Sequence, residues 1–405
     1  MQFIIFSHKG AMEMAESKVL YLQKVKNQNV SHILHKIWEH EAVSRIELVQ
    51  MTHLTSGTIT NLTQELISHR LIKESESISD SVGRKRVNLR FDNSYFYIIG
   101  IDIGRTSVSV VLSELTGNIV DTVEYGTEGI TNPEEVLALI EPYVHKLLGQ
   151  AESRKRKVIG IGVSIPGPMD QRTGKLINPP GFPGWAGYPI RPTLEERFKT
   201  RVFIEDDART SALAERWYGI GRDGRDLVFV TMGMGIGGGI VQNGRVLHGT
   251  NGLYGQIGQM SLMTHGGAGD AISYDCWENL GSIPGILKRW SGNGDFRDYI
   301  VQVRAQEPHA VKVMEDTLRM LEASLTSLIN LYDPDVIVLG GKLYPYLSPH
   351  MEAIVENVRS RVFDFVQERV IIEKAFYGQM QSLMGAVALV FGHVQENPLL
   401  VLGAD

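Results

Sequence analysis

Residues 95–120, YFYIIGIDIGRTSVSVVLSELTGNIV, decide the fold. An apolar, β-branched run leads to Asp102, and a second apolar run follows the glycine turn, which predicts two buried strands joined by a tight turn. The stretch from Asp102 to Thr106 is a candidate phosphate loop. A carboxylate at a strand end can hold Mg²⁺ through water, Gly104 lets the backbone approach a ligand, and Thr106 can donate to a phosphate oxygen. An ordinary tight turn is the alternative interpretation.

A second glycine-rich loop follows another apolar strand in residues 228–241, VFVTMGMGIGGGIV. Two such loops, each leaving a buried strand, indicate two phosphate-binding walls of a cleft between ribonuclease-H-like α/β lobes. Tight β-turns in a packed sheet are the alternative for either loop taken singly. The candidate glycines of this loop include Gly235, Gly237 and Gly238.

Between these loops, residues 204–215 read IEDDARTSALAE, a strand end that turns into a helix. A carboxylate at a helix N-terminus is electrostatically favourable, so simple capping explains Asp207. The functional alternative is a general base that removes a proton from a sugar hydroxyl as that hydroxyl attacks phosphorus.

The first 90 residues have a different character from the rest. They hold 12 Lys and Arg against 9 Asp and Glu, a net +3, which leaves −9 for the other residues of a chain with net charge −6. Val30, Ile33, Leu34 and Ile37 have helical spacing. A basic head on an acidic body suggests two tasks on one chain.

A capping box at Ser44 and Glu47 predicts a short helix, and a second helix starts near Ser56 with an uncharged polar face. Residues 81–91, SVGRKRVNLRF, add a basic turn and a strand. Together they predict a winged helix-turn-helix, with an ordinary helical bundle as the alternative. We expect DNA contacts from side chains of both helices and the wing turn: Ser44, Arg45, Ser56, Gly57, Thr58, Thr60, Asn61, Gln64, Gly83, Arg84, Lys85 and Arg86. On the second helix we expect Ile59, Leu62, Leu66 and Ile67 to be buried.

Length and composition limit the classes of protein to which the chain can belong. At 405 residues with 43% hydrophobic and 21% charged residues, the chain is typical of a globular protein of two or three domains. A single cysteine, Cys276, favours a reducing compartment, and no apolar run approaches the length of a membrane span. We therefore expect a cytoplasmic protein without a membrane partner.

Seven segments, in this order, resemble the ROK family of sugar kinases and sugar-responsive repressors: DIGRT at 102–106, GVSIPGPMDQRTGKLINPPGFPGW at 162–185, IEDDARTSALAE, TMGMGIGGGIVQNGRVLHG, GLYGQIGQM, CWENLGS and LYDPDVIVLGG. The basic head is similar to the repressor branch. The resemblance implies an actin-like, two-lobed α/β body behind a winged helix-turn-helix. We expect an extension at 1–25, the DNA-binding head at 26–92, lobe 1 at 93–210, lobe 2 at 211–390 and a tail at 391–405 that returns to lobe 1.

The resemblance also implies site residues. Asp207 matches the catalytic Asp of the kinases, Glu278 matches a Glu that holds sugar hydroxyls, and Asp206 stands where those kinases usually have Asn. Asp102, Gly104 and Thr106 match the first phosphate motif, and the second loop's glycines match the other.

Departures from the family pattern are equally informative. Gln256 and Gln259 replace a sugar-binding Glu and a His that contacts sugar and zinc, while Arg105 and Met234 replace small residues where nucleotide phosphates would lie. Only Cys276 remains of three zinc thiolates, and one Cys does not make a structural site. We expect no metal or other cofactor, with the loop held by packing around Trp277 and Tyr274; a site improvised from Cys276, His265 and Asp270 is the alternative.

These features predict a transcriptional regulator, most simply a repressor of carbohydrate metabolism, and not an enzyme. The expected partners are double-stranded operator DNA, a sugar or sugar derivative bound by Asp206, Asp207, Gln256, Gln259 and Glu278, and a second copy of the chain, as a homodimer or a dimer of dimers. The retained Asp102 and Asp207 leave an ATP-dependent sugar kinase with a DNA-binding head as the alternative. A regulator controlled by a transport protein is a third.

Overall fold

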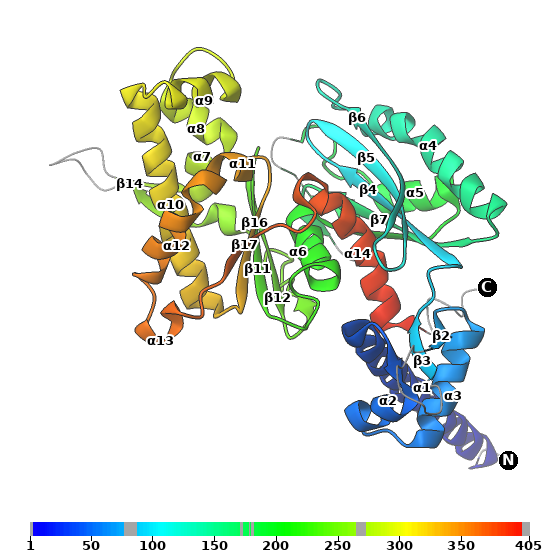
Figure 1. Cartoon of the computed structure of the whole chain (residues 1–405). Helices are drawn as coiled ribbons and strands as arrows, with labels where there is room; N and C mark the ends of the chain where they lie inside the picture. Colours follow the sequence, from blue (N-terminus) through cyan, green and yellow to red (C-terminus); the bar gives the residue numbers. More distant parts are fainter. Residues whose placement is uncertain are drawn as a thin grey trace.

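The computed structural model describes residues 3–76, 87–170, 173–177, 179, 182–264 and 273–398. Figure 1 shows two α/β lobes side by side, with a small head below one of them. None of the helices in these ranges combines the length and the apolar composition that a membrane span requires.

The head is a winged helix-turn-helix. Its helices are α1 (Phe3–His40), α2 (Arg45–Thr52) and α3 (Ser56–Ser68), and its small antiparallel sheet has the order β1 (Val43–Ser44), β3 (Val87–Phe91), β2 (Ile72–Glu76). The predicted capping box starts α2, because Ser44 accepts a bond from the Glu47 amide while Glu47 accepts one from the Ser44 amide. Residues 1–2 and the wing turn at 77–86 lie outside the described residues.

The head core confirms most of the predicted apolar face. Val30, Ile33, Leu34 and Ile37 of α1 are buried, as are Ile59, Leu62 and Leu66 of α3. Ile67 was expected to be buried, but its side chain is only partly buried against the core. The α1 helix also runs without interruption across the expected boundary at residues 25 and 26.

Lobe 1 is built on a five-stranded sheet in the order β10-β7-β4-β5-β6. Strands β4, β5 and β6 pair antiparallel, whereas β4, β7 and β10 pair parallel. Helices α4 and α5 and a small β8–β9 ribbon complete this lobe. The bounds are β4 (Phe96–Ile103), β5 (Ser107–Glu114), β6 (Ile119–Gly126), α4 (Pro133–Ser153), β7 (Lys157–Ile165), β8 (Met169–Asp170), β9 (Lys175–Leu176), α5 (Ile190–Phe198) and β10 (Val202–Asp206).

Lobe 2 repeats the same arrangement in its sheet, β13-β12-β11-β16-β17, with three antiparallel strands followed by two parallel ones. Because the two sheets have the same strand order, the turn between β4 and β5 in lobe 1 corresponds to the turn between β11 and β12 in lobe 2. Its strands and helices are β11 (Leu227–Met232), β12 (Ile236–Gln242), β13 (Arg245–Val246), β14 (Ser261–Thr264), β15 (Ser273–Cys276), α7 (Trp277–Gly281), α8 (Ile283–Trp290), α9 (Phe296–Arg304), α10 (Pro308–Tyr332), β16 (Val336–Gly340), α11 (Tyr344–Leu347), α12 (Met351–Arg359), α13 (Asp364–Gln367) and β17 (Ile372–Lys374).

Two helices join the lobes: α6 (Asp207–Tyr218) and α14 (Gln381–Glu396). They pack on each other, with α14 against β4 and β7 of lobe 1 and α6 against β11 and β12 of lobe 2. The expected lobe boundaries at 210/211 and 390/391 therefore fall inside helices, because each helix belongs to the joint between lobes.

The head docks directly on this joint. Trp38 of α1 contacts Phe91 and Phe391, and its indole N–H donates to the Trp217 carbonyl oxygen at 3.0 Å. One hydrophobic cluster runs from α1 and α3 through β3 to α6 and α14. Burial of this shared surface holds the head to the body.

Candidate functional site

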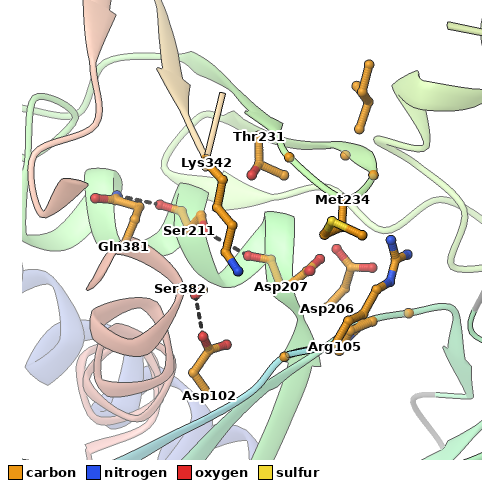
Figure 2. Close-up of a pocket in the computed structure, with 18 of the residues that line it drawn as sticks. Asp102, Arg105, Asp206, Asp207, Ser211, Thr231, Met234, Lys342, Gln381 and Ser382 are labelled. Atoms are coloured by element: carbon orange, nitrogen blue, oxygen red, sulfur yellow. Dashed lines mark hydrogen bonds between the residues drawn. The ribbon is translucent and has the colours of Figure 1, made fainter. Parts of the chain in front are cut away.

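The predicted ligand and loop residues all meet in one cavity of about 390 Å³ between the lobes. Figure 2 shows this cavity, with Asp102 and Arg105 from lobe 1 on one side and Thr231 and Lys342 from lobe 2 on the other. The residues that were predicted from the sequence and that line this cavity are Asp102, Gly104, Thr106, Asp206, Asp207, Gly235, Gly237, Gly238, Gln256, Gln259 and Glu278.

The first loop forms a closed turn at the end of β4. The Gly104 amide donates to the Ser107 carbonyl at 2.8 Å, and Asp102 accepts a bond from the Ser382 hydroxyl at 2.7 Å. Burial raises the pKa of Asp102, and hydrogen bonds from serine hydroxyls oppose that shift. Asp102 is thus held in place by α14, which packs on β4 and β7 of the same lobe.

The two adjacent aspartates have different tasks. Asp206 is the N-cap of α6, since its carboxylate accepts bonds from the Ala208 and Arg209 amides at 3.1 and 3.4 Å. Capping therefore belongs to Asp206, whereas the sequence had suggested it for Asp207. The Asp207 side chain points into the cavity (Figure 2).

The electrostatics of this pair are unusual. Burial, together with the charges of Asp206 and Asp102, raises the pKa of Asp207 to about 7, and Arg105 opposes that shift. Burial and the neighbouring Glu205 also raise the pKa of Asp206. A carboxyl group with a pKa near neutrality can exchange a proton with a bound hydroxyl, or donate a hydrogen bond to it.

The second loop is tied to Glu278. The Glu278 carboxylate accepts a bond from the Ile236 amide at 2.8 Å, so this side chain supports the loop as well as facing the cavity. A Cβ atom at Gly235 would lie 2.6 Å from Glu278 Oε2 and 3.1 Å from Arg105 Nη1. Only glycine fits that position without moving the glutamate.

Cationic side chains bridge the lobes between the two glycine loops. The Arg105 guanidinium of lobe 1 reaches the Gly235 loop of lobe 2, and the Lys342 ammonium donates to the Thr106 hydroxyl at 2.8 Å. Figure 2 shows Met234 beside Arg105 at this end of the cavity. The space between the two glycine loops is therefore partly filled by the protein's own side chains.

The region around Cys276 differs from one expectation. Trp277 is fully buried, but Tyr274 is 67% exposed, so it does not contribute to the packing predicted for this loop. The Cys276 thiol is partly buried at the end of β15, and His265 and Asp270 lie outside the described residues. Within the described ranges, no group of three or more His, Cys, Asp and Glu side chains is placed to hold a metal.

The candidate DNA-binding surface lies on α3 and the turn before it. Ser56, Gly57, Thr60, Asn61 and Gln64 are exposed, and Thr58 is partly exposed. Two of the residues predicted to contact DNA also make bonds within the head. Ser44 caps α2, and Arg45 bonds Thr63 and pairs with Glu74. The wing residues Gly83, Arg84, Lys85 and Arg86 lie outside the described residues.

Sequence reasoning missed several polar residues of the cleft, among them Lys342, Ser382 and Gln381. Lys342 follows the glycine pair at the end of β16, and that pair was a usable signal. Ser382 and Gln381 begin α14, in a stretch with no local indication of a site; Gln381 bonds Glu215 at 2.8 Å and the Ser211 carbonyl at 3.0 Å.

Comparison with known proteins gives a consistent result. The profile of the ROK family matches residues 98–393. The putative xylose repressor of Caldicellulosiruptor sp. (strain Rt8B.4) is 26% identical over 391 residues, covering 92% of this chain and 98% of that protein.

Solved structures share the fold. A ROK family transcriptional regulator, described as a homologue of the E. coli MLC protein, aligns with a TM-score of 0.78 at 24% identity, over 94% of this chain and 100% of that one. The ROK hexokinase from Thermus thermophilus aligns with a TM-score of 0.62 at 27% identity, over 74% of this chain and 99% of that one. The regulator thus matches the head as well as the body, whereas the hexokinase leaves about a quarter of this chain unmatched.

Proposed function

This chain belongs to the ROK family, and from that premise we propose that it is a cytoplasmic DNA-binding regulator of carbohydrate metabolism, most simply a repressor. Its head binds operator DNA, and a sugar or sugar derivative binds in the cleft between the lobes. The observation that carries the proposal is a winged helix-turn-helix packed directly on the joint of a ROK body. The similarity to a putative xylose repressor along nearly the whole chain supports it.

The exposed face of α3 suits readout of bases. Its N-terminal half presents short uncharged side chains, which can enter the major groove without clashing with its walls. Asn61 and Gln64 carry amides that can bond adenine in a bidentate way. The Thr55 hydroxyl caps α3 through the Thr58 amide at 3.2 Å, so this face starts from a fixed turn.

The cleft suits a hydroxylated ligand. Asp206, Asp207 and Glu278 supply acceptors, and Gln256 and Gln259 can both donate and accept. Hydroxyl groups of a sugar have the same dual character. The pocket is therefore chemically suited to a monosaccharide, while Arg105 and Lys342 occupy the end where nucleotide phosphates would bind.

Helix α14 offers the route from cleft to head. Ser382 at its start bonds Asp102 in the cleft, and Phe391 near its end packs on Trp38 of α1. A ligand that changes how the lobes close over Asp102 would move α14, and α14 would move the head. Such a ligand must have different affinities for the DNA-competent and DNA-incompetent arrangements. We propose that two heads act together in a homodimer or dimer of dimers, since paired heads can read two half-sites.

A gel-shift assay on the DNA upstream of the chain's own gene tests this function. We expect a retarded complex at low salt, where phosphate contacts are strongest, and release by one member of a panel of hexoses, pentoses and their derivatives. A correctly folded protein that retards no fragment at low salt would refute the assignment as a DNA-binding regulator.

A sugar kinase is the second candidate, because Asp207 is retained in the cleft with its pKa raised to about 7. ADP release from ATP, measured with the same panel of sugars, separates the two. The regulator proposal predicts no turnover above that of Asp207→Asn. Turnover that disappears in this variant would assign the kinase activity.

A further inference from the structure

A second and larger cavity, of about 950 Å³, lies where the head meets both lobes. Its walls come from α1 of the head, from the edge strand β10 of lobe 1, from the edge strand β13 of lobe 2, and from α6 and α14 between them. Figure 1 shows the lower end of α14 beside α1 at this junction. We call it the junction cavity; it shares no lining residue with the cleft.

The charged side chains around the junction cavity are not balanced. Two of its carboxylates already have partners: Glu205 pairs with Arg209 at 2.9 Å and with His248 of the same lining at 2.6 Å, and Glu195 accepts a bond from the Val202 amide. The third acid is Glu396; burial raises its pKa, and the nearby Arg245, Arg216 and His248 oppose that shift. The cationic side chains on the lining are Lys24, Arg191, Arg201 and Arg245.

Two of these cations make no direct hydrogen bond or ion pair in the part of the chain that the structure describes, although Arg245 lies near enough to Glu396 to lower the pKa of that acid. Within the described residues, no hydrogen bond or ion pair involves the guanidinium groups of Arg201 or Arg245. Arg201 directly precedes the edge strand β10 of lobe 1 and Arg245 lies in the edge strand β13 of lobe 2, so an anion between them would be held by both lobes. Guanidinium groups suit phosphate and carboxylate oxygens because their N–H groups form a planar fork.

The same cavity has a flat aromatic floor. The rings of Phe203 and His393 stack with centroids 4.5 Å apart and an interplanar angle of 30°. Burial, with Arg191 and Arg201 nearby, lowers the pKa of His393. Positive charge here therefore comes mainly from the guanidinium groups rather than from the imidazole.

Asn27 of the head lines the junction cavity and bonds the end of α14 in the body. Its amide N–H donates to the Glu396 carbonyl at 3.0 Å and to Asn397 Oδ1 at 3.3 Å, whereas its own Oδ1 is buried without a partner within the described residues. A hydroxyl group on a ligand would supply that missing donor. Because Asn27 belongs to the head and Glu396 to the body, a ligand bound there touches both sides of the junction.

We propose that the junction cavity is a second ligand site, which takes a small hydroxylated metabolite bearing a phosphate or carboxylate group. The anionic group lies between Arg201 and Arg245, the body of the ligand covers the Phe203–His393 pair, and a hydroxyl group donates to Asn27. The site is independent of the cleft, and its occupant fixes the head relative to both lobes.

Isothermal titration calorimetry of the full chain with inorganic phosphate and pyrophosphate, at constant ionic strength set with chloride, tests the proposal. We expect binding that Arg201→Gln and Arg245→Gln each weaken by about tenfold, as loss of a charge-assisted bond implies. Arg297→Gln, an exposed arginine on α9, is the matched control, and Arg105→Gln reports on binding in the cleft. Arg297→Gln is expected to leave the affinity unchanged.

Hydrogen exchange with and without pyrophosphate locates the site independently of these substitutions. Slower exchange in peptides covering 24–28 and 389–397, without slower exchange at 102–107, supports the proposal. Three results would overturn it: no binding at millimolar phosphate or pyrophosphate, binding weakened only by Arg105→Gln, or binding that none of the substitutions changes.

Discussion

Replacing Asp207 by Asn should stabilise the protein in a pH-dependent way. The folded-state pKa is raised from 3.8 to about 7, so the folded protein keeps this proton after the unfolded chain has released it. Stability linked to the proton is therefore complete below about pH 4 and is lost as the pH rises through 7. Asparagine does not titrate, so the stability of the variant does not fall in this way as the pH rises.

The size of the effect follows from the shift. One pKa unit corresponds to about 1.4 kcal/mol. The free energy of unfolding that the Asp207 proton contributes therefore falls by at most about 3 kcal/mol between pH 5 and pH 7. The side chain lines a cavity that is open to water, which reduces the expectation to about 1–2 kcal/mol. Urea denaturation at pH 5 and pH 8 measures it, with Asp223→Asn on the exposed loop after α6 as the control of equal charge change. An Asp207→Asn advantage that does not grow between the two pH values would refute the electrostatic reasoning.

Three further variants test the head and its attachment. Ser44→Ala removes the cap of α2 and should lower the free energy of unfolding by about 1 kcal/mol; an unchanged denaturation midpoint would count against the cap. Trp38→Phe keeps an aromatic ring but removes the bond to the Trp217 carbonyl, and urea denaturation should show a loss of about 1–3 kcal/mol. Combined Asn61→Ala and Gln64→Ala should weaken binding to operator DNA by about 1–3 kcal/mol for each base that the variant no longer reads, measured by fluorescence anisotropy, while the thermal midpoint stays the same. Equal affinity of variant and parent for operator DNA would remove α3 as the reading helix.

Local chemistry explains why much of the cleft was predictable. Each glycine loop follows an apolar strand, so the sequence alone assigns both loops and the carboxylate at 102 to strand ends. Equivalent strand ends of the two repeated sheets face one cleft, which brings the loops together. The capping box of α2 was equally readable, because its two partners are three residues apart.

Pairs between distant parts of the chain were not predictable in this way. Ser382 bonds Asp102 across 280 positions, and Lys342 bonds Thr106 across 236. No periodicity or spacing encodes such pairs, since they depend on how α14 and β16 pack. The same holds for Trp38, because no local pattern indicates that its indole would bond a carbonyl of α6.

Errors in detail had physical causes too. Tyr274 was expected to pack because it is large and close to Trp277, but it lies on a short exposed ribbon. Asp206 caps α6 instead of Asp207 because β10 extends to Asp206, and the cap is the last residue before the helix. One residue of register thus decides which carboxylate caps the helix.

The most direct test of the central claim, a DNA-reading head governed by the body, is selection of duplexes from a random library by the full chain. We predict that one sequence is enriched, that Asn61→Ala with Gln64→Ala abolishes the enrichment, and that a sugar bound in the cleft changes the affinity for the selected DNA. A folded protein that enriches no sequence at low salt, or enriches the same sequence with both side chains removed, would contradict it.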